Sequence, residues 1–221
     1  MLLLLFDIDG TLINSGGAGA AALNRAFKSR YNVDDAMAAV DPHGQTDMVI
    51  VEEIFLKKLK KTPSTEEIKE ILDLYVGYLR EEVNRAERYV VLPYVRETLD
   101  FLLKENEFVL GLATGNVEEG ARIKLERGDL NKYFPFGGFG SDSRVRSEIV
   151  RKAVERGGNY SKKKPDEVYV IGDTPLDIEA GKKASCKTIG IATSIYSVEE
   201  LKKCKPDYTI SNMGELLRIF S

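Results

Sequence analysis

The most constraining feature of this 221-residue sequence is a series of short runs that are almost entirely apolar. Each run is followed by a longer segment with the periodicity of an amphipathic helix. Strands without a polar face must be covered on both sides, and strands that alternate with helices form parallel sheets. The sequence therefore predicts an α/β fold, with a Rossmann-like parallel sheet and helices on both of its faces. The expected strands are Leu2 to Phe6, Phe108 to Ala113, Val168 to Ile171, Thr188 to Ile191 and a short last one, Tyr208 to Ile210.

The alternation is interrupted between about residues 16 and 88, where helical segments follow one another without a strand. This pattern predicts a helical domain of residues 16–90, inserted after the first strand of an α/β core of residues 1–15 and 91–221. The expected hinges are Asn14 to Gly17, which is rich in glycine, and Val90 to Pro93, which contains proline. The expected helices of the insert are Ala18 to Ser29, Asp47 to Leu59 and Thr65 to Arg88.

The charge balance argues against several classes of partner. The 32 basic and 35 acidic residues are mixed along the chain and leave a formal charge of −3, so we expect no nucleic-acid partner. The apolar start is too short for a membrane span and ends in acids, which does not fit a signal peptide. Two cysteines and one histidine without metal-ligand spacing disfavour a zinc site. We expect a cytoplasmic protein with no membrane partner, and the sequence leaves its oligomeric state open.

Polar side chains follow three of the predicted strands at the point where each strand ends. Asp7 and Asp9 come directly after the first strand, Thr114, Gly115 and Asn116 follow the second, and the stretch from Gly172 to Asp177 follows the third. Ligands of open parallel sheets bind outside the carboxyl ends of the strands. We therefore expect these groups to converge in one crevice.

Four carboxylates in one crevice, those of Asp7, Asp9, Asp173 and Asp177, would repel one another unless a divalent cation lay among them. Mg²⁺ is usually held by a few carboxylates together with substrate phosphate. The backbone N–H groups from Thr114 to Asn116, at the start of a predicted helix, suit an anion. The sequence thus predicts Mg²⁺ as cofactor, with Asp7, Asp9, Asp173 and Asp177 as its ligands. It also predicts a small phosphorylated metabolite as partner, with Gly115 and Asn116 among the substrate contacts.

These motifs resemble the haloacid dehalogenase superfamily of phosphotransferases. Its pattern is a strand that ends in Asp-x-Asp-Gly-Thr, a second strand that ends in Thr or Ser, a Lys or Arg, and then Gly-Asp-x-x-x-Asp. This chain has Asp7 to Thr11, Thr114 and Gly172 to Asp177 in that order, over nearly its whole length. The helical insert looks like the first cap type of the superfamily, and Gly172 to Gly181 is similar to its phosphoglycolate phosphatase-like branch.

The resemblance implies a Mg²⁺-dependent phosphatase that hydrolyses a phosphoglycolate-like phosphomonoester through an aspartyl-phosphate. It implies that Asp7 is the nucleophile, Asp9 the general acid and base, Thr114 a phosphate ligand and Asp173 a metal ligand that Asp177 supports. A dehalogenase is disfavoured, because the dehalogenases of the superfamily lack an acid at the position of Asp9. A phosphomutase, or a non-catalytic phosphate-binding or regulatory protein, stays open as an alternative.

The third motif of the superfamily commonly has a lysine before a proline, whereas this chain has only arginines between Phe139 and Glu148. We favour Arg146, which would open a helix that runs to Arg156, over Arg144. An arginine keeps its charge and can bind phosphate through two nitrogens, so the change is compatible with activity.

The stretch from His43 to Asp47 looks like the cap specificity loop of the superfamily, which reads Gly-x-Thr-Asp in relatives. We expect Gly44, Gln45 and Thr46 to contact the substrate, since a glycine in a loop that faces a crevice allows close approach. Alternatively, Thr46 or Asp47 is an ordinary helix N-cap.

Overall fold

A six-stranded sheet, parallel throughout, forms the centre of the computed structural model, which describes residues 1–220. The strand order is β5-β4-β1-β6-β7-β8, so the first strand lies in the middle and pairs with β4 and β6. The α/β prediction is confirmed, and each expected strand is present within one residue at either end. The strands are β1 (Leu2–Phe6), β4 (Phe108–Ala113), β5 (Gly137–Gly138), β6 (Glu167–Gly172), β7 (Lys187–Ile191) and β8 (Tyr208–Ile210).

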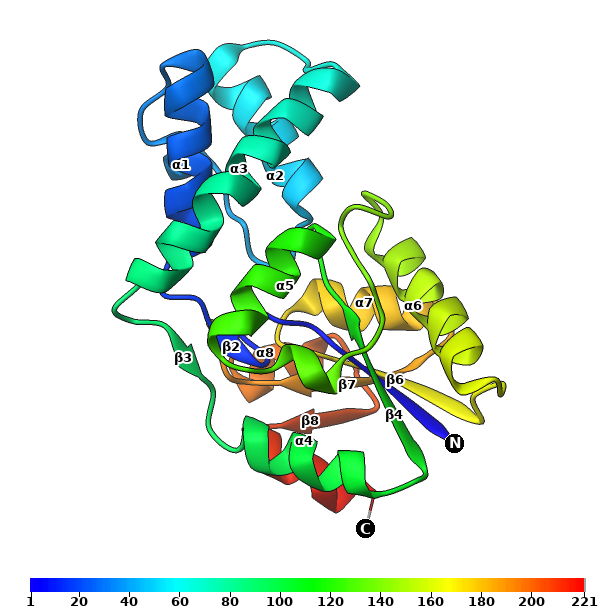
Figure 1. The fold of residues 1–221 in the computed structure, drawn as a ribbon. Coiled ribbons are helices and arrows are strands. Elements are labelled where there is room, and N and C mark those ends of the chain that lie inside the picture. The colour runs from blue at the N-terminus through cyan, green and yellow to red at the C-terminus, as the bar shows by residue number, and fades with distance from the viewer. Residues whose placement is uncertain (221) are drawn as a thin grey trace.

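Both faces of the sheet are covered, as the apolar strands require. Leu4 and Phe6 of β1 belong to one apolar cluster with residues of α4, α5 and the C-terminal 3₁₀ helix, whereas Leu3 and Leu5 belong to another with residues of α6 and α7. Figure 1 shows these helices around the sheet. The helices of this part are α4 (Val95–Lys104), α5 (Glu118–Arg127), α6 (Arg146–Ser161), α7 (Pro175–Lys183), α8 (Val198–Lys203) and the 3₁₀ helices Asn131–Tyr133 and Met213–Ile219.

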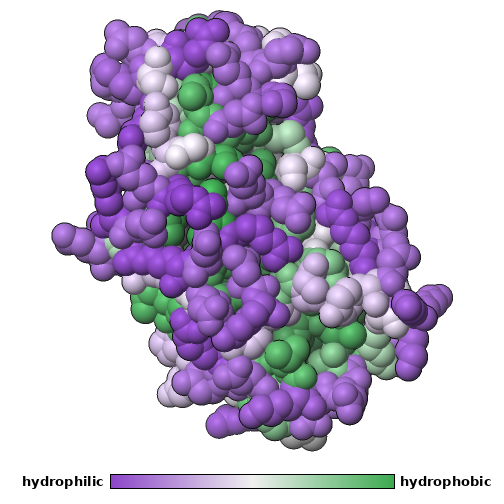
Figure 2. Space-filling view, viewed as in Figure 1, coloured by the Kyte–Doolittle hydropathy of each residue, from purple (hydrophilic) through white to green (hydrophobic). Residues whose placement is uncertain are grey.

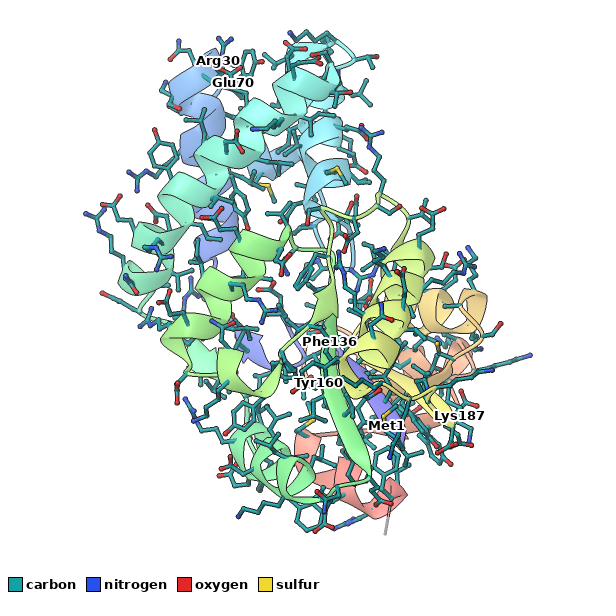
Figure 3. The ribbon with its side chains drawn as sticks, turned by 45° about the vertical axis from the view of Figure 1, so that its right-hand side comes forward. Met1, Arg30, Glu70, Phe136, Tyr160 and Lys187 are labelled. Carbon is teal, nitrogen blue, oxygen red and sulfur yellow. The ribbon has the colours of Figure 1, made fainter. Side chains whose placement is uncertain are left out.

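Three helices between β2 (Ile13–Asn14) and β3 (Val90–Val91) stand together beyond one end of the sheet, at the top of Figure 1. They share an apolar cluster of their own, in which the rings of Phe27 and Phe55 lie 5.4 Å apart. An ion pair of 2.7 Å between Arg30 and Glu70 joins the far ends of α1 and α3 (Figure 3). The helices are α1 (Ala18–Tyr31), α2 (Asp47–Ile54), continued by a π-helical turn (Phe55–Leu59), and α3 (Thr65–Arg85), with a 3₁₀ turn at Ala36–Ala39.

The two predicted hinges lie side by side, because β2 (Ile13–Asn14) and β3 (Val90–Val91) form an antiparallel pair. Neither strand was expected, since two residues are too few to show an alternating pattern. The third predicted helix ends at Arg85 rather than Arg88, because Ala86 takes an extended conformation that leads the chain toward β3. The division into a core and a cap at residues 16 and 90 stays a prediction.

The surface shows mainly hydrophilic residues on the face in Figure 2, with smaller hydrophobic areas between the upper helices and on the lower part. Within residues 1–220, no helix combines the length and the apolar character needed to cross a bilayer.

The apolar cluster of the three helices should hold the insert together. We expect Phe27→Ala to lower the free energy of unfolding by about 3–5 kcal/mol, because Phe27 is fully buried and its loss leaves a cavity. Phe101→Ala on α4 is the matched control, since that ring is 48% exposed. Urea unfolding followed by circular dichroism measures both. Equal losses in the two variants would contradict the prediction.

Candidate active site

The carboxyl ends of three neighbouring strands open into one cavity of about 280 Å³. Asp7 follows β1, Thr114 follows β4 and Asp173 follows β6, and all three side chains line the cavity. This is where ligands bind in open parallel sheets. The structure thus brings together the three motifs that the sequence analysis singled out.

An acidic cluster lies at the sheet side of the cavity. Carboxylate oxygens of Asp7, Asp173 and Asp177 all lie within 4.8 Å of one another, and the three residues are buried. The guanidinium of Arg146 faces the cluster, with Nη2 3.5 Å from Oδ1 of Asp7 and in hydrogen-bond contact with Asp177. Arg144, the alternative of the sequence analysis, instead pairs with Glu52 of α2 at 2.6 Å.

The acidic cluster carries more negative charge than Arg146 balances. Burial and then the charge of Asp177 raise the pKa of Asp173 to about 7. Burial and the charge of Asp177 likewise hold the pKa of Asp7 well above its usual range, against the opposing effect of Arg146. Oxygen donors with excess negative charge are what a hard divalent cation such as Mg²⁺ prefers. The donor set therefore fits Mg²⁺.

Local chemistry explains how these acids are held. The hydroxyl of Thr11 donates to Asp173 at 3.0 Å, and Gly10, with a φ of 81°, lies so close that a Cβ there would collide with the same carboxylate. Asp177 closes a capping box at the start of α7, where its carboxylate accepts from the backbone N–H of Thr174 at 3.1 Å. One side chain thus both caps a helix and faces Arg146.

Asp9 lies only two residues from Asp7 but has different partners. Its carboxylate accepts hydrogen bonds from Lys124 at 2.6 Å, Asn116 at 3.0 Å and Ser15 at 2.9 Å. Burial by itself would raise the pKa of Asp9, but the Lys124 charge and these three hydrogen bonds bring it below its usual value. Among the described residues, the group that could hold a metal contains Asp7 but not the side chain of Asp9.

Lys124 is a site residue that the sequence analysis missed. It lies on α5, is 5% exposed, and donates to Asn116 as well as to Asp9, both at 2.6 Å. Burial disfavours its charge, but nearby Asp9 outweighs this effect and the pKa of Lys124 lies above its usual value. The sequence held one signal for Lys124, its place between the apolar residues Ile123 and Leu125 on the helix. A lysine on the buried side of a helix is rarely unpaired, so a buried acidic partner could have been expected.

The stretch that follows β4 is closely packed. The hydroxyl of Thr114 accepts from the side-chain amide of Asn116 at 2.9 Å, so Asn116 links Thr114, Asp9 and Lys124. The predicted contact of Asn116 with substrate therefore competes with bonds inside the protein. A Cβ at Gly115 would collide with the backbone carbonyl of Gln45, so this glycine allows the insert to approach the sheet.

The loop before α2 contributes two of its three predicted residues to the cavity. Gly44 and Gln45 line it, whereas Thr46 is absent from the lining as the structure describes it and caps α2 by accepting from Val49 at 3.3 Å. Asp47, the first residue of α2, also lines the cavity. Its backbone N–H donates to Gly115 at 2.9 Å, so the loop is fastened to the core.

The carboxylate of Asp47 is buried at a cost to stability. One oxygen accepts from the backbone N–H of Val117 at 2.8 Å, yet burial raises the pKa of Asp47 to about 6, against the opposing charge of Lys124. The unfolded chain releases this proton near pH 4. The contribution of Asp47 to the free energy of unfolding is therefore fully present below pH 4, where its carboxyl group is protonated in both states. This contribution is lost as the pH rises through 6.

We expect Asp47→Asn, which has no proton to lose, to become more stable than the parent as the pH rises. The melting temperatures should be similar at pH 4 and differ increasingly up to about pH 7, by the equivalent of about 2–3 kcal/mol. Thermal unfolding at several pH values measures this difference. A difference that stays constant with pH would show that the burial of the Asp47 charge has no such cost.

Comparison with known proteins identifies the family whose motifs line this cavity. Residues 4–191 match the haloacid dehalogenase-like hydrolase family. A phosphoglycolate phosphatase from Aquifex aeolicus is 30% identical over 227 residues, which cover 99% of this chain and 96% of that protein. The pyrophosphatase PpaX from Anoxybacillus flavithermus is 26% identical over 222 residues, with 98% and 95% covered. The crystal structure of a hydrolase from Pseudomonas syringae has the same fold, with a TM-score of 0.74, 20% identity and coverage of 100% and 98%.

The family match runs from within β1 to the end of β7 and includes all the motifs of the cavity, and the relatives are covered over nearly their whole length. The resemblance that the motifs indicated is therefore confirmed. The chain belongs to the haloacid dehalogenase-like hydrolase family, within which it is a phosphatase that acts on a phosphorylated substrate.

Proposed function

We propose that the protein is a Mg²⁺-dependent phosphatase that hydrolyses a small phosphomonoester through an aspartyl-phosphate on Asp7. The observation that carries this proposal is the unequal surroundings of two neighbouring acids. Asp7 faces the acidic cluster and Arg146, whereas Asp9 is held by Lys124, Asn116 and Ser15. Such a separation of environments is how two carboxyl groups take different roles in one site.

The carboxylates of Asp7, Asp173 and Asp177 would hold the Mg²⁺ ion. When bound, the ion neutralises charge on the phosphoryl group that is transferred. The sequence analysis also predicted Asp9 as a metal ligand. We assign its carboxylate to proton transfer instead, because its hydrogen bonds direct it toward Lys124 and Asn116.

The reaction then consists of two displacements at phosphorus. In the first, a carboxylate oxygen of Asp7 attacks the phosphorus, the ester bond breaks, and Asp9 donates a proton to the leaving oxygen. Because the pKa of Asp9 lies below its usual value, this step takes place in the minor fraction of the protein in which Asp9 is protonated. In the second, Asp9 takes a proton from a water molecule that attacks the aspartyl-phosphate, which releases inorganic phosphate and restores Asp7. Arg146 and the hydroxyl of Thr114 stabilise the charged phosphoryl oxygens.

The helical insert acts as a cap in this proposal. Its loop reaches the core where Gly115 meets Gln45, and closure there excludes bulk water and large substrates. Phosphoglycolate is the reference substrate, since the sequence resemblance and the name of the Aquifex aeolicus relative both point to it. A cytoplasmic location, in which the Cys186 and Cys204 thiols stay free, belongs to the same proposal.

Removal of the nucleophile should abolish turnover. We expect Asp7→Asn to lower phosphate release from a panel of phosphate esters with Mg²⁺ by at least about 10³-fold, because the amide cannot attack phosphorus. Chelation of the metal should have a similar effect. Asp73→Asn, on the exposed surface of α3, is the control. Phosphate release that survives either treatment would overturn the mechanism, and sugar-phosphate interconversion with little phosphate release would identify a phosphomutase.

The two arginines should differ in their effect on activity. We expect Arg146→Ala to reduce kcat/KM by about 10²–10³-fold, because it removes the cation that faces Asp7. Arg144→Ala should change it by less than about threefold, because Arg144 forms only a partly exposed ion pair with Glu52. Steady-state kinetics with folding checked by circular dichroism decides between them. A larger loss in the Arg144 variant would reverse the assignment.

A further inference from the structure

Besides Oε1 of Gln45, two polar groups of the insert line the cavity without a full set of hydrogen-bond partners among residues 1–220. The hydroxyl of Tyr75, a residue that is 1% exposed, forms no hydrogen bond with any residue that the structure describes. Asp47 is 6% exposed, and only one of its carboxylate oxygens is bonded within residues 1–220, to Val117. Buried polar groups are normally paired, so these two indicate where a polar ligand binds.

These two groups lie on the Lys124 side of the cavity, away from the acidic cluster. A Cβ at Gly19 of α1 would lie 3.5 Å from Nζ of Lys124 and 3.8 Å from the hydroxyl of Tyr75. The ammonium of Lys124 and the hydroxyl of Tyr75 therefore both lie close to Gly19. Because Gly19 has no side chain, there is room for a ligand atom beside these two groups. With the phosphoryl group at Asp7, this is the space that a leaving group would occupy.

The charges on this side do not suit an anionic leaving group. The cavity is lined by three basic residues, and each already has an acidic partner: Arg146 faces the acidic cluster, His43 contacts Asp41, and Lys124 is bonded to Asp9. The described lining of this side also includes the carboxylate of Asp47. A carboxylate or a second phosphate would meet these acids without a cation of its own, which costs binding energy.

We propose, on the basis of the proposed function, that the natural leaving group is a neutral hydroxylated one, such as a polyol or a sugar. A hydroxyl of the leaving group donates to the free oxygen of Asp47 and accepts from Tyr75. This substrate class differs from phosphoglycolate and pyrophosphate, the compounds in the names of the two relatives.

Matched pairs of esters test the charge of the leaving group. 2-Hydroxyethyl phosphate and phosphoglycolate differ only in a hydroxymethyl group against a carboxylate, as do glycerol 3-phosphate and 3-phosphoglycerate. We expect kcat/KM to be at least about tenfold higher for the alcohol of each pair. Pyrophosphate should be as poor as the carboxylates, and ethyl phosphate, which lacks the hydroxyl, should also be poorer than 2-hydroxyethyl phosphate.

Variants of Tyr75, Asp47 and Gly19 test whether these residues contact the leaving group. Tyr75→Phe removes a hydroxyl that has no hydrogen-bond partner in the described part of the chain, so folding should be preserved, and kcat/KM should fall about tenfold more for glycerol 3-phosphate than for ethyl phosphate. Tyr78→Phe on the same helix is the control, because Tyr78 lies outside the described lining of the cavity and stacks under Arg25. Asp47→Asn should shift the preference toward the carboxylates, and Gly19→Ala should raise KM for glycerol 3-phosphate.

The outcomes separate this inference from the proposed function. If no ester releases phosphate with the parent protein, the proposed function fails and this inference fails with it. If phosphate is released but the carboxylates or pyrophosphate are hydrolysed as well as the alcohols, only this inference is overturned. An unchanged preference in both Tyr75→Phe and Asp47→Asn would overturn it as well, whereas the expected shifts support it.

Discussion

Three buried carboxylates, those of Asp7, Asp173 and Asp177, lie together at the carboxyl edge of the sheet, where the guanidinium of Arg146 pairs with Asp7 and Asp177. This imbalance of charge is the constraint on which the rest of the site depends. Burial, and then repulsion from the charge of Asp177, raises the pKa of Asp173 to about 7, because the three acids cannot all be ionised there without a cation. The same imbalance makes the edge of the sheet a place for a divalent ion and a phosphoryl group.

The contrast between Asp7 and Asp9 follows from what surrounds each of them. The side chain of Asp7 lies among acids, and that of Asp9 lies in a network of donors centred on Lys124 and Asn116. The network holds the pKa of Asp9 low while the pKa of Asp7 is raised. Two acids close in sequence are thus made chemically different by residues from the loop after β4 and from α5, which are distant along the chain.

The insert completes the site from the other side. The backbone of Asp47 bonds to Gly115 and its carboxylate to Val117, so the start of α2 is attached to the loop that follows β4. This attachment buries an acid whose pKa is raised to about 6. Polar groups that are costly to bury and lack full pairing are common at functional sites, and here they face the space beside the phosphoryl position.

The sequence by itself determined the sheet, its order of motifs and the acids at its edge. Apolar strands without a polar face can only be buried between helices, and the carboxyl ends of parallel strands converge, so Asp7, Thr114 and Asp173 could be placed together from local pattern alone. The short strands β2, β3 and β5 could not be predicted, because two residues carry no periodicity, and β2 and β3 pair with each other outside the main sheet.

Only the tertiary structure decided which side chain partners which. The sequence favoured Arg146 over Arg144 only by its place at the start of a predicted helix. That Arg146 faces the acidic cluster while Arg144 pairs with Glu52 depends on how α6 meets the sheet and the insert. Lys124 and Tyr75 lie on ordinary amphipathic helices, and their roles arise from packing against residues far away in the chain. Local pattern records which face of an element is buried, but it carries no information on what that face meets.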